Sequence, residues 1–147
     1  MQSDEPKILI VLVHGVWADG TGWQHVIPDL LDAGYDVTAV QLPLISLEND
    51  IATLERVIVA HNGPVVLAAH SYGGIPVTNA TNDHPNVKAL VYVTSFAPDI
   101  GEWSVGTLPR AIVLLVQGII SGGIGGVPVI LGAILGIIPV LVKSSPR

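Results

Sequence analysis

The chain has 147 residues, of which half are hydrophobic and 12% are charged; this balance predicts a folded domain and excludes a disordered chain. The formal net charge of −6 argues against a nucleic-acid partner, because phosphate binding needs a basic surface. The chain has no cysteine, so disulfides and thiolate metal sites are excluded.

The first part of the chain alternates apolar runs with amphipathic segments. Ile8–Val13 is a continuous apolar run, which is typical of a strand buried on both faces. Apolar residues then recur at helical spacing on one face of a predicted helix: Trp23, Val26, Ile27, Leu30 and Leu31. Gly34 ends this helix, and Pro28 is tolerated near its first turn. Val37–Leu42 predicts the next strand.

The same alternation continues to residue 94. Ser46 can cap a second helix, whose apolar face carries Leu47, Ile51, Leu54 and Ile58. Val65–Ala69 predicts a third strand, a helix follows it to about Asn82, and Val87–Thr94 predicts a fourth strand. Strands that alternate with helices predict an α/β fold, in which a parallel sheet carries flanking helices. In such a sheet, functional residues lie past the carboxyl ends of the strands.

The segment Ala69-His70-Ser71-Tyr72-Gly73 follows the third strand and opens a helix, which is the pattern of a nucleophile elbow with Ala at the first position. The sharp turn needs small residues two positions before and after the serine, and Ala69 and Gly73 meet that need. Ser71 is therefore predicted to be a nucleophile, with the Tyr72 N–H and the helix N-terminus facing an incoming oxyanion. The alternative is a serine that only caps the helix.

A second polar cluster, His14-Gly15-Val16-Trp17, follows the first strand. Gly15 lets the backbone turn back, so that the N–H of Val16, or alternatively that of Trp17, can face Ser71 as a second oxyanion donor. The alternative is an ordinary loop that uses Gly15 only for its conformation.

Four aromatic or imidazole side chains near these clusters have less specific roles. Trp17 and Trp23 are candidates for the walls of a substrate pocket, with burial in the core as the alternative. His14 is predicted to be a structural, hydrogen-bonded residue. His70 is predicted to point away from the cleft.

Three stretches together resemble the α/β-hydrolase superfamily: VLVHGVWADGTGWQHVIPDLLDAGYDVTAVQLPL, GPVVLAAHSYGG and VKALVYVTSFAPDIGE. The resemblance covers roughly residues 7–108. It is nearest to bacterial esterase-like hydrolases, in the same broad group as plant methyl-ester esterases and hydroxynitrile lyases.

This resemblance implies a small-molecule ester or acyl substrate and neither a cofactor nor a metal. It also implies Ser71 as the nucleophile, Val16 and Tyr72 as the oxyanion donors, and the strand order second, first, third, fourth. Ala69 departs from the usual glycine of the elbow, a departure that some lipases of the family share.

The acid and the histidine of a catalytic triad are not found in the sequence. In the superfamily both follow the serine, whereas His84, the one histidine after Ser71, precedes the fourth strand, at the edge of the sheet opposite the cleft. Asp99 and Glu102 lie on the cleft side, but they complete no triad without a histidine. The sequence therefore predicts either a serine hydrolase with an incomplete triad, or an inactive truncated fragment that is membrane-attached or only binds. A lyase of the hydroxynitrile type is a third alternative.

The charge distribution divides the chain into two segments. All acidic residues lie between Asp4 and Glu102, whereas residues 111–142 carry no charge. We therefore expect a partial α/β-hydrolase domain at residues 1–108 and an apolar C-terminal segment at residues 109–147.

Ala111–Val142 is long enough for a membrane span, which needs about 20 apolar residues. Alternatively, this segment covers the edge of the sheet, or it has no evolved role, as after a frame shift, a fusion or a truncation.

The acidic N-terminus predicts no secretion signal. A cytoplasmic location is therefore expected, with membrane association as the alternative.

We expect the full chain to partition to membranes or to aggregate, because burial of apolar surface is favourable by about 25 cal/mol per Å². A version that ends near Leu108 should be more soluble, yet still unstable. Sedimentation and detergent extraction of the two versions side by side test this. A full chain that is monomeric in buffer, with residues 111–142 protected from protease, would exclude the membrane interpretation.

Overall fold

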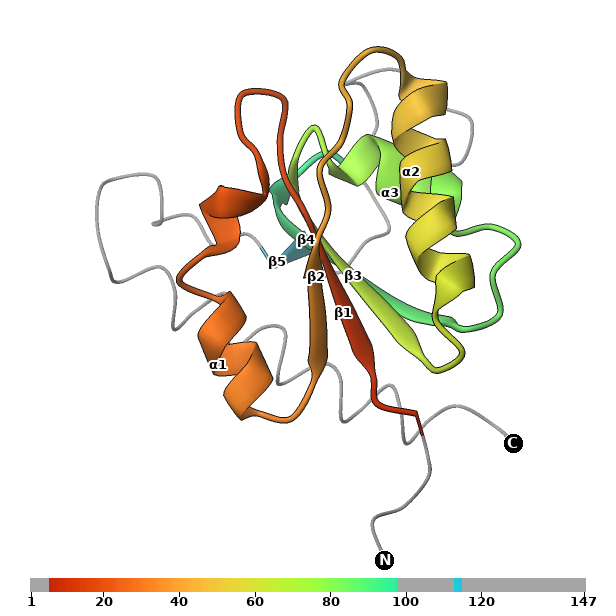
Figure 1. Ribbon diagram of the computed structural model, residues 1–147. Coiled ribbons are helices and arrows are strands. Elements are labelled where there is room, and N and C mark those ends of the chain that lie inside the picture. The colour runs from red at the N-terminus through yellow and green to blue at the C-terminus, as the bar shows by residue number, and fades with distance from the viewer. Residues whose placement is uncertain (1–5, 98–112, 115–147) are drawn as a thin grey trace, which may run out of the picture.

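A parallel sheet forms the centre of the described part of the chain (Figure 1). The computed structural model describes residues 6–97 and 113–114. Its strands are β1 (Leu9–Val13), β2 (Asp36–Ala39), β3 (Val65–Ser71), β4 (Val87–Ser95) and β5 (Val113–Leu114). They lie in the order β2-β1-β3-β4-β5, and every neighbouring pair is parallel. The predicted α/β class and the predicted order of the first four strands are confirmed.

Helices cover both faces of this sheet. The helices in chain order are the 3-10 helix η1 (Gly20–Trp23), α1 (Ile27–Asp32), α2 (Leu47–Ala60) and α3 (Gly74–Ala80). Figure 1 shows α1 on one side of the sheet and α2 with α3 on the other. Because side chains alternate along a strand, Ile10 and Leu12 of β1 pack on the α1 side, whereas Val11 packs on the α2 side. β1 is therefore buried on both faces, as its continuous apolar run predicts.

The helix predicted over Trp23–Leu31 is in fact two short helices. Trp23, Val26 and Leu30 are buried as expected, but Leu31 is 51% exposed. Pro28 lies at the first or second position of α1. Its ring lacks an N–H and would disrupt a helix that began at Trp23, so the chain restarts its helix just before the proline.

β2 is shorter than the predicted strand Val37–Leu42. Its ladder continues as far as Val40, whose N–H donates to the Leu12 carbonyl over 3.1 Å. The Leu42 N–H instead donates to His14 Nε2 over 3.0 Å, so at this point the backbone bonds to a side chain and no longer to β1. The His14 ring is buried, and its Nδ1 lies 2.8 Å from the Gly15 carbonyl. His14 is therefore the structural, hydrogen-bonded histidine that the sequence predicts.

α2 forms where the sequence predicts the second helix. Ser46 is its N-cap, and the Ser46 hydroxyl accepts the Asn49 N–H over 3.3 Å. Leu54 and Ile58 are fully buried, and Ile51 packs against the same cluster. Through these residues α2 packs against side chains of β1 and β3 on one face of the sheet.

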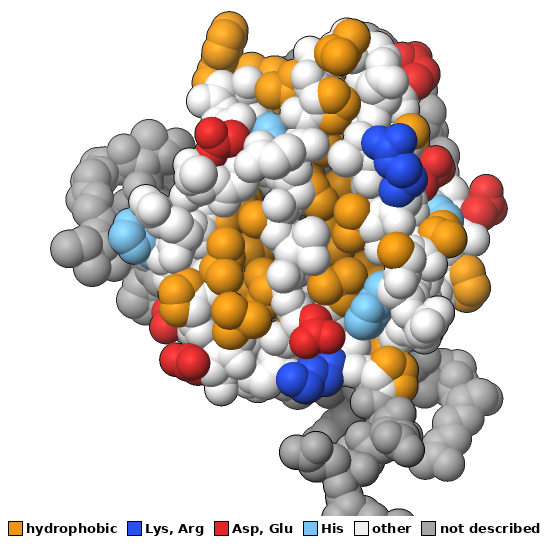
Figure 2. All heavy atoms as spheres, viewed as in Figure 1, with side chains coloured by type: hydrophobic (Ala, Val, Ile, Leu, Met, Phe, Trp, Pro, Cys, Tyr) orange, Lys and Arg blue, Asp and Glu red, His pale blue; other side chains and the backbone are white. Residues whose placement is uncertain are grey.

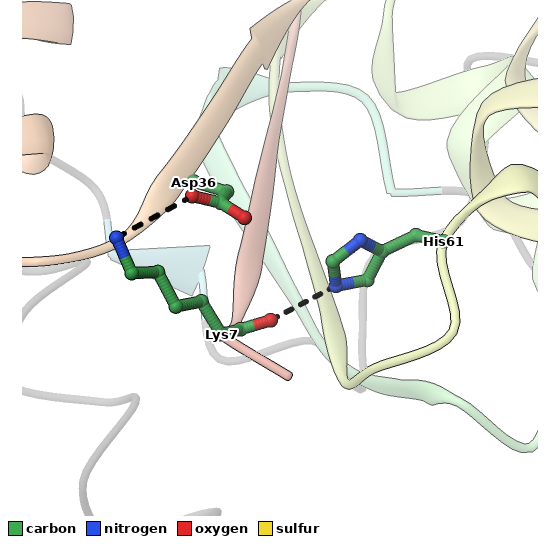
Figure 3. A network of polar contacts seen from close by, with 3 residues as sticks. All are labelled: Lys7, Asp36 and His61. Atoms are coloured by element: carbon green, nitrogen blue, oxygen red, sulfur yellow. Dashed lines mark hydrogen bonds and ion pairs between the residues drawn. The ribbon is translucent and has the colours of Figure 1, made fainter. Parts of the chain in front are cut away.

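A polar network joins the amino ends of β1 and β2 to the end of α2 (Figure 3). Lys7 Nζ lies 3.9 Å from an Asp36 carboxylate oxygen, and His61 Nε2 lies 2.9 Å from the Lys7 carbonyl. An exposed ion pair of this kind contributes at most about 1 kcal/mol. Its charges nevertheless lie at the start of β2, the outermost strand on this side, where charged side chains disfavour pairing with another chain.

The surface beside β2 is partly apolar. Within β2, Asp36 is exposed and the other three residues are half-buried. Figure 2, drawn from the same side, shows hydrophobic side chains reaching the surface in the middle of this face, with charged side chains around them.

β5 lies within the segment predicted to be an apolar tail. Tyr92 and Val93 of β4 are paired with Val113 and Leu114. This pairing favours the interpretation in which the segment covers the edge of the sheet. The rest of Ala111–Val142 lies outside the described residues, so the division near residue 108 and the membrane span stay predictions. In the described ranges, no helix is long and apolar enough to cross a membrane.

We expect Leu12→Ala to lower the free energy of unfolding by about 2–5 kcal/mol, because Leu12 is fully buried between the sheet and α1. The matched control is Leu31→Ala, which truncates a half-exposed leucine and should cost below about 1 kcal/mol. Urea unfolding followed by tryptophan fluorescence measures both, since Trp23 is buried in the same cluster. Equal losses in the two variants would contradict the placement of Leu12.

Candidate active site

The candidate site lies at the carboxyl ends of β1 and β3. β3 ends at Ser71, two turn residues follow, and α3 begins at Gly74. Ser71 has a φ of 52°, in the left-handed region that non-glycine residues rarely adopt. The predicted strained strand-to-helix turn is therefore present. Such a conformation costs about 1–3 kcal/mol and persists only where the surroundings hold it.

The end of β4 holds the Ser71 backbone. The Ser71 carbonyl accepts the Phe96 N–H over 3.1 Å and the Ser95 hydroxyl over 2.8 Å. The register between β3 and β4 shifts here, because His70 is paired with Val93 and Ser71 with Ser95. Thr94 lies between those partners and has a φ of 47°, a second strained residue beside the site.

Two glycines after Ser71 allow the backbones to approach closely. A Cβ on Gly73 would lie 2.7 Å from the His14 carbonyl oxygen. A Cβ on Gly74 would overlap the Phe96 carbonyl oxygen. The small residue that the elbow requires at position 73 therefore has a direct cause, the contact with the end of β1.

The loop after β1 lies against Ser71. A Cβ placed on Gly15 would lie 2.9 Å from Ser71 Cβ and 3.4 Å from Ser71 Oγ. Neither the Val16 N–H nor the Tyr72 N–H donates to any residue between 6 and 97. Two backbone donors without a protein partner in that range thus lie in the loop and the turn that flank Ser71. An oxyanion hole requires two such free donors, both aimed at one point beside the nucleophile.

His70 and His84, the last histidine before Ser71 and the first after it in sequence, lie in very different places. His70 Nδ1 would be 3.4 Å from a Cβ on Gly15, so its ring lies beside the loop that follows β1. Desolvation lowers the pKa of His70, which favours the neutral imidazole. His84 precedes β4, at the opposite end of the sheet. Because β3 spans Val65–Ser71 at about 3.3 Å per residue, this separation is about 20 Å.

No side chain between residues 6 and 97 hydrogen-bonds to Ser71 Oγ. Asp99 and Glu102, the two carboxylates predicted on the cleft side, lie outside the described residues. Within those residues, no group of three His, Asp or Glu side chains could hold a metal ion.

An apolar cavity of about 220 Å³ adjoins the candidate oxyanion donors. It is lined by Val16, Leu44, Ile45, Ser46, Leu47, Tyr72 and Ile75. Neither tryptophan proposed as a pocket wall is among these residues. Trp17 is 98% exposed, and Trp23 is 5% exposed in the core beneath α1. The walls of this cavity come from the loop after β1, from the segment that leads into α2, and from the turn and helix that follow Ser71.

Asp50 is the residue at this site that the sequence reasoning missed. It is fully buried on α2, and its carboxylate accepts the Leu44 N–H over 2.9 Å and the Tyr72 hydroxyl over 2.6 Å. The signal was present in the sequence, because Asp50 shares the helical spacing i, i+4, i+8 with Leu54 and Ile58. A carboxylate on the apolar face of a helix indicates buried hydrogen-bond partners.

A model of the alpha/beta hydrolase family matches residues 10–137. The chain belongs to the α/β-hydrolase family. The match extends past residue 108, so the family pattern reaches into the segment that the charge distribution set apart.

This α/β hydrolase is similar to several esterases over part of their length. It is 30% identical over 115 residues to the carbendazim hydrolyzing esterase of Nocardioides sp. (strain SG-4G), covering 69% of this chain and 48% of that protein. It is 37% identical over 103 residues to methylesterase 9 of Arabidopsis thaliana, covering 60% of this chain and 40% of that one. The chain therefore spans about half the length, or less, of these relatives.

Solved structures agree with this assignment. The structure of polyneuridine aldehyde esterase matches with a TM-score of 0.58 at 28% identity, over 63% of this chain and 42% of that one. The pyrethroid hydrolase from Sphingobium faniae JZ-2 matches with a TM-score of 0.55 at 26% identity, over 60% of this chain and 40% of that one.

We expect Gly74→Ala to lower the free energy of unfolding by about 1–3 kcal/mol, because its methyl group would overlap the Phe96 carbonyl that the turn places there. Gly22→Ala is the matched control, since a Cβ at Gly22 meets nothing within 4 Å. Urea midpoints of the two variants give the comparison. A Gly74→Ala protein as stable as the control would show that α3 and the end of β4 do not approach as closely as described.

Proposed function

We propose that this α/β hydrolase carries the nucleophile and the oxyanion site of a serine hydrolase that acts on small esters. Ser71 Oγ is the nucleophile, and the N–H groups of Val16 and Tyr72 are the oxyanion donors. The observation that carries the proposal is the strained Ser71 turn, flanked by two amides that have no partner between residues 6 and 97. The esterase names of the relatives support the substrate class.

The proposed reaction has two steps. Ser71 Oγ attacks the ester carbonyl carbon, and the carbonyl oxygen becomes an oxyanion beside the Val16 and Tyr72 amides. The carbon–oxygen bond of the ester then breaks, the alcohol leaves with a proton, and an acyl group remains on Ser71. In the second step, water releases the acid and restores the serine. The apolar cavity next to Val16 and Tyr72 would hold an uncharged group of the substrate.

The fate of the serine proton sets the expected rate. In a complete triad, a histidine hydrogen-bonded to Oγ takes this proton. No histidine between residues 6 and 97 makes that bond here, so solvent would take the proton. The same observation favours the alternative function, a site that binds an ester without turning it over.

We expect hydrolysis of p-nitrophenyl acetate to be at least about a thousandfold slower than by an enzyme with a complete triad, the order of loss when a triad member is removed. Ser71→Ala should abolish the rate above the buffer background. Thr53→Ala, which removes a hydroxyl on α2, is the control and should leave the rate unchanged. Release of p-nitrophenol gives the rate, and mass spectrometry detects the acyl group on Ser71.

Three results separate the alternatives. A slow rate that depends on Ser71 supports the proposal. Ester binding with no acyl group on Ser71 supports the binding function instead. Rapid turnover that depends on Ser71 would show that some residue acts as its base. His84→Ala, followed by His70→Ala, would then test which histidine takes the proton.

A further inference from the structure

A buried carboxylate, that of Asp50, accepts hydrogen bonds from two residues that border the candidate site. Asp50 is in the first turn of α2 and is fully buried, on the helix face that also carries Leu54 and Ile58. An ionised carboxylate among apolar side chains is strongly unfavourable unless hydrogen bonds satisfy it. The partners of Asp50 therefore indicate what its burial achieves.

Both partners of Asp50 belong to the site. One oxygen accepts the Leu44 N–H over 2.9 Å, and the other accepts the Tyr72 hydroxyl over 2.6 Å. Leu44 and Tyr72 lie on opposite sides of Asp50 in sequence, yet both line the apolar cavity. Tyr72 also directly follows Ser71, and its backbone N–H is the oxyanion donor of the proposed function.

Leu44 needs such a contact to keep its conformation. Its φ is 54°, and a leucine in the left-handed region is strained by roughly 1–3 kcal/mol. The bond from its N–H to a buried carboxylate is charge-assisted, and such bonds are about twice as strong as neutral ones. The hydrogen bond to Asp50 thus offsets part of the strain at Leu44, which forms one wall of the cavity.

The hydroxyl of Tyr72 remains a donor over the ordinary pH range. Desolvation raises the pKa of Tyr72 well above its usual value, and the hydrogen bond to Asp50 adds to this effect. The raised pKa favours the protonated phenol, which is the form that donates a hydrogen bond to Asp50.

We propose that Asp50 is a positioning residue, which fixes the Tyr72 N–H beside Ser71 and the Leu44 wall of the cavity through one carboxylate. The proposal rests on the proposed function, because it needs a reaction at Ser71 to act upon. Asp50 does not touch the substrate. It acts through the Tyr72 ring and through the Leu44 backbone, and its loss lets the elbow and the cavity wall move independently.

The test measures the Ser71-dependent rate, defined as the rate of the protein minus that of its Ser71→Ala form, with p-nitrophenyl acetate as the probe. The variants of the full chain are Asp50→Asn, Tyr72→Phe and the two combined. Tyr72→Phe keeps the ring and removes one oxygen, so it serves if Asp50→Asn fails to fold. Glu55→Gln is the matched control, because it makes the same change on an exposed position of α2. Urea unfolding gives the folded fraction of each protein.

Each single variant should lower kcat per folded molecule by about ten- to a hundredfold, the loss expected when a donor is displaced by about 1 Å. The combined variant should be no slower than the slower single variant, because the two residues act as one unit. KM should change much less than kcat for this small ester.

Three other outcomes are distinguishable. If the unchanged protein has no Ser71-dependent rate, the proposed function fails and the positioning role fails with it. If that rate is present, but both single variants match Glu55→Gln per folded molecule, the positioning role alone is overturned. The same conclusion follows if the variants lower only the urea midpoint, since Asp50 would then be a purely structural residue.

Discussion

The site depends on the backbone of Ser71, which is held in a conformation that the isolated chain would avoid. The bonds from Phe96 and Ser95 fix its carbonyl, while Gly73 and Gly74 let β1 and the end of β4 approach from two sides. These contacts come from strands that are far apart in sequence. The turn therefore exists only once the parallel sheet has assembled, and the sheet is a precondition of the chemistry proposed for Ser71.

Strain is concentrated around this point. Among the described residues, the non-glycine residues with positive φ are Leu44, Ser71 and Thr94. Leu44 lines the cavity, Ser71 is the proposed nucleophile, and Thr94 occupies the register shift between β3 and β4. Strained residues of this kind cluster at functional sites, because only a rigid surrounding structure can hold them. Here the surrounding structure is the sheet on one side and the buried Asp50 carboxylate on the other.

Family membership and catalytic completeness are separate questions for this chain. The family match, the sheet order and the Ser71 turn all agree with one another. This chain, however, matches only 48% of the carbendazim hydrolyzing esterase and 40% of methylesterase 9. The described residues include the proposed nucleophile and the two proposed amide donors, and none of their side chains is hydrogen-bonded to Ser71 Oγ. The pairing of β5 with β4 places a short piece of the apolar segment at the strand position next to β4.

The sequence by itself determined those features that depend on near neighbours in the chain. Burial of β1 on both faces follows from its unbroken apolar run, and the start of α2 follows from the Ser46 cap. The elbow could be predicted because its strain demands small residues at fixed spacing, a local requirement that leaves a local pattern. The break before α1 also had a local signal, in Pro28, although a single helix was expected there.

Only the tertiary structure decided which distant residues meet at the site. The early end of β2 depends on a bond from Leu42 to His14, and the cavity walls depend on how the 44–47 segment folds over the elbow. Asp50 is joined to Tyr72 although 22 positions separate them. Hydrogen-bond partners at such distances leave no periodic pattern in a sequence, because they are set by the packing of α2 on the sheet and not by the helix itself.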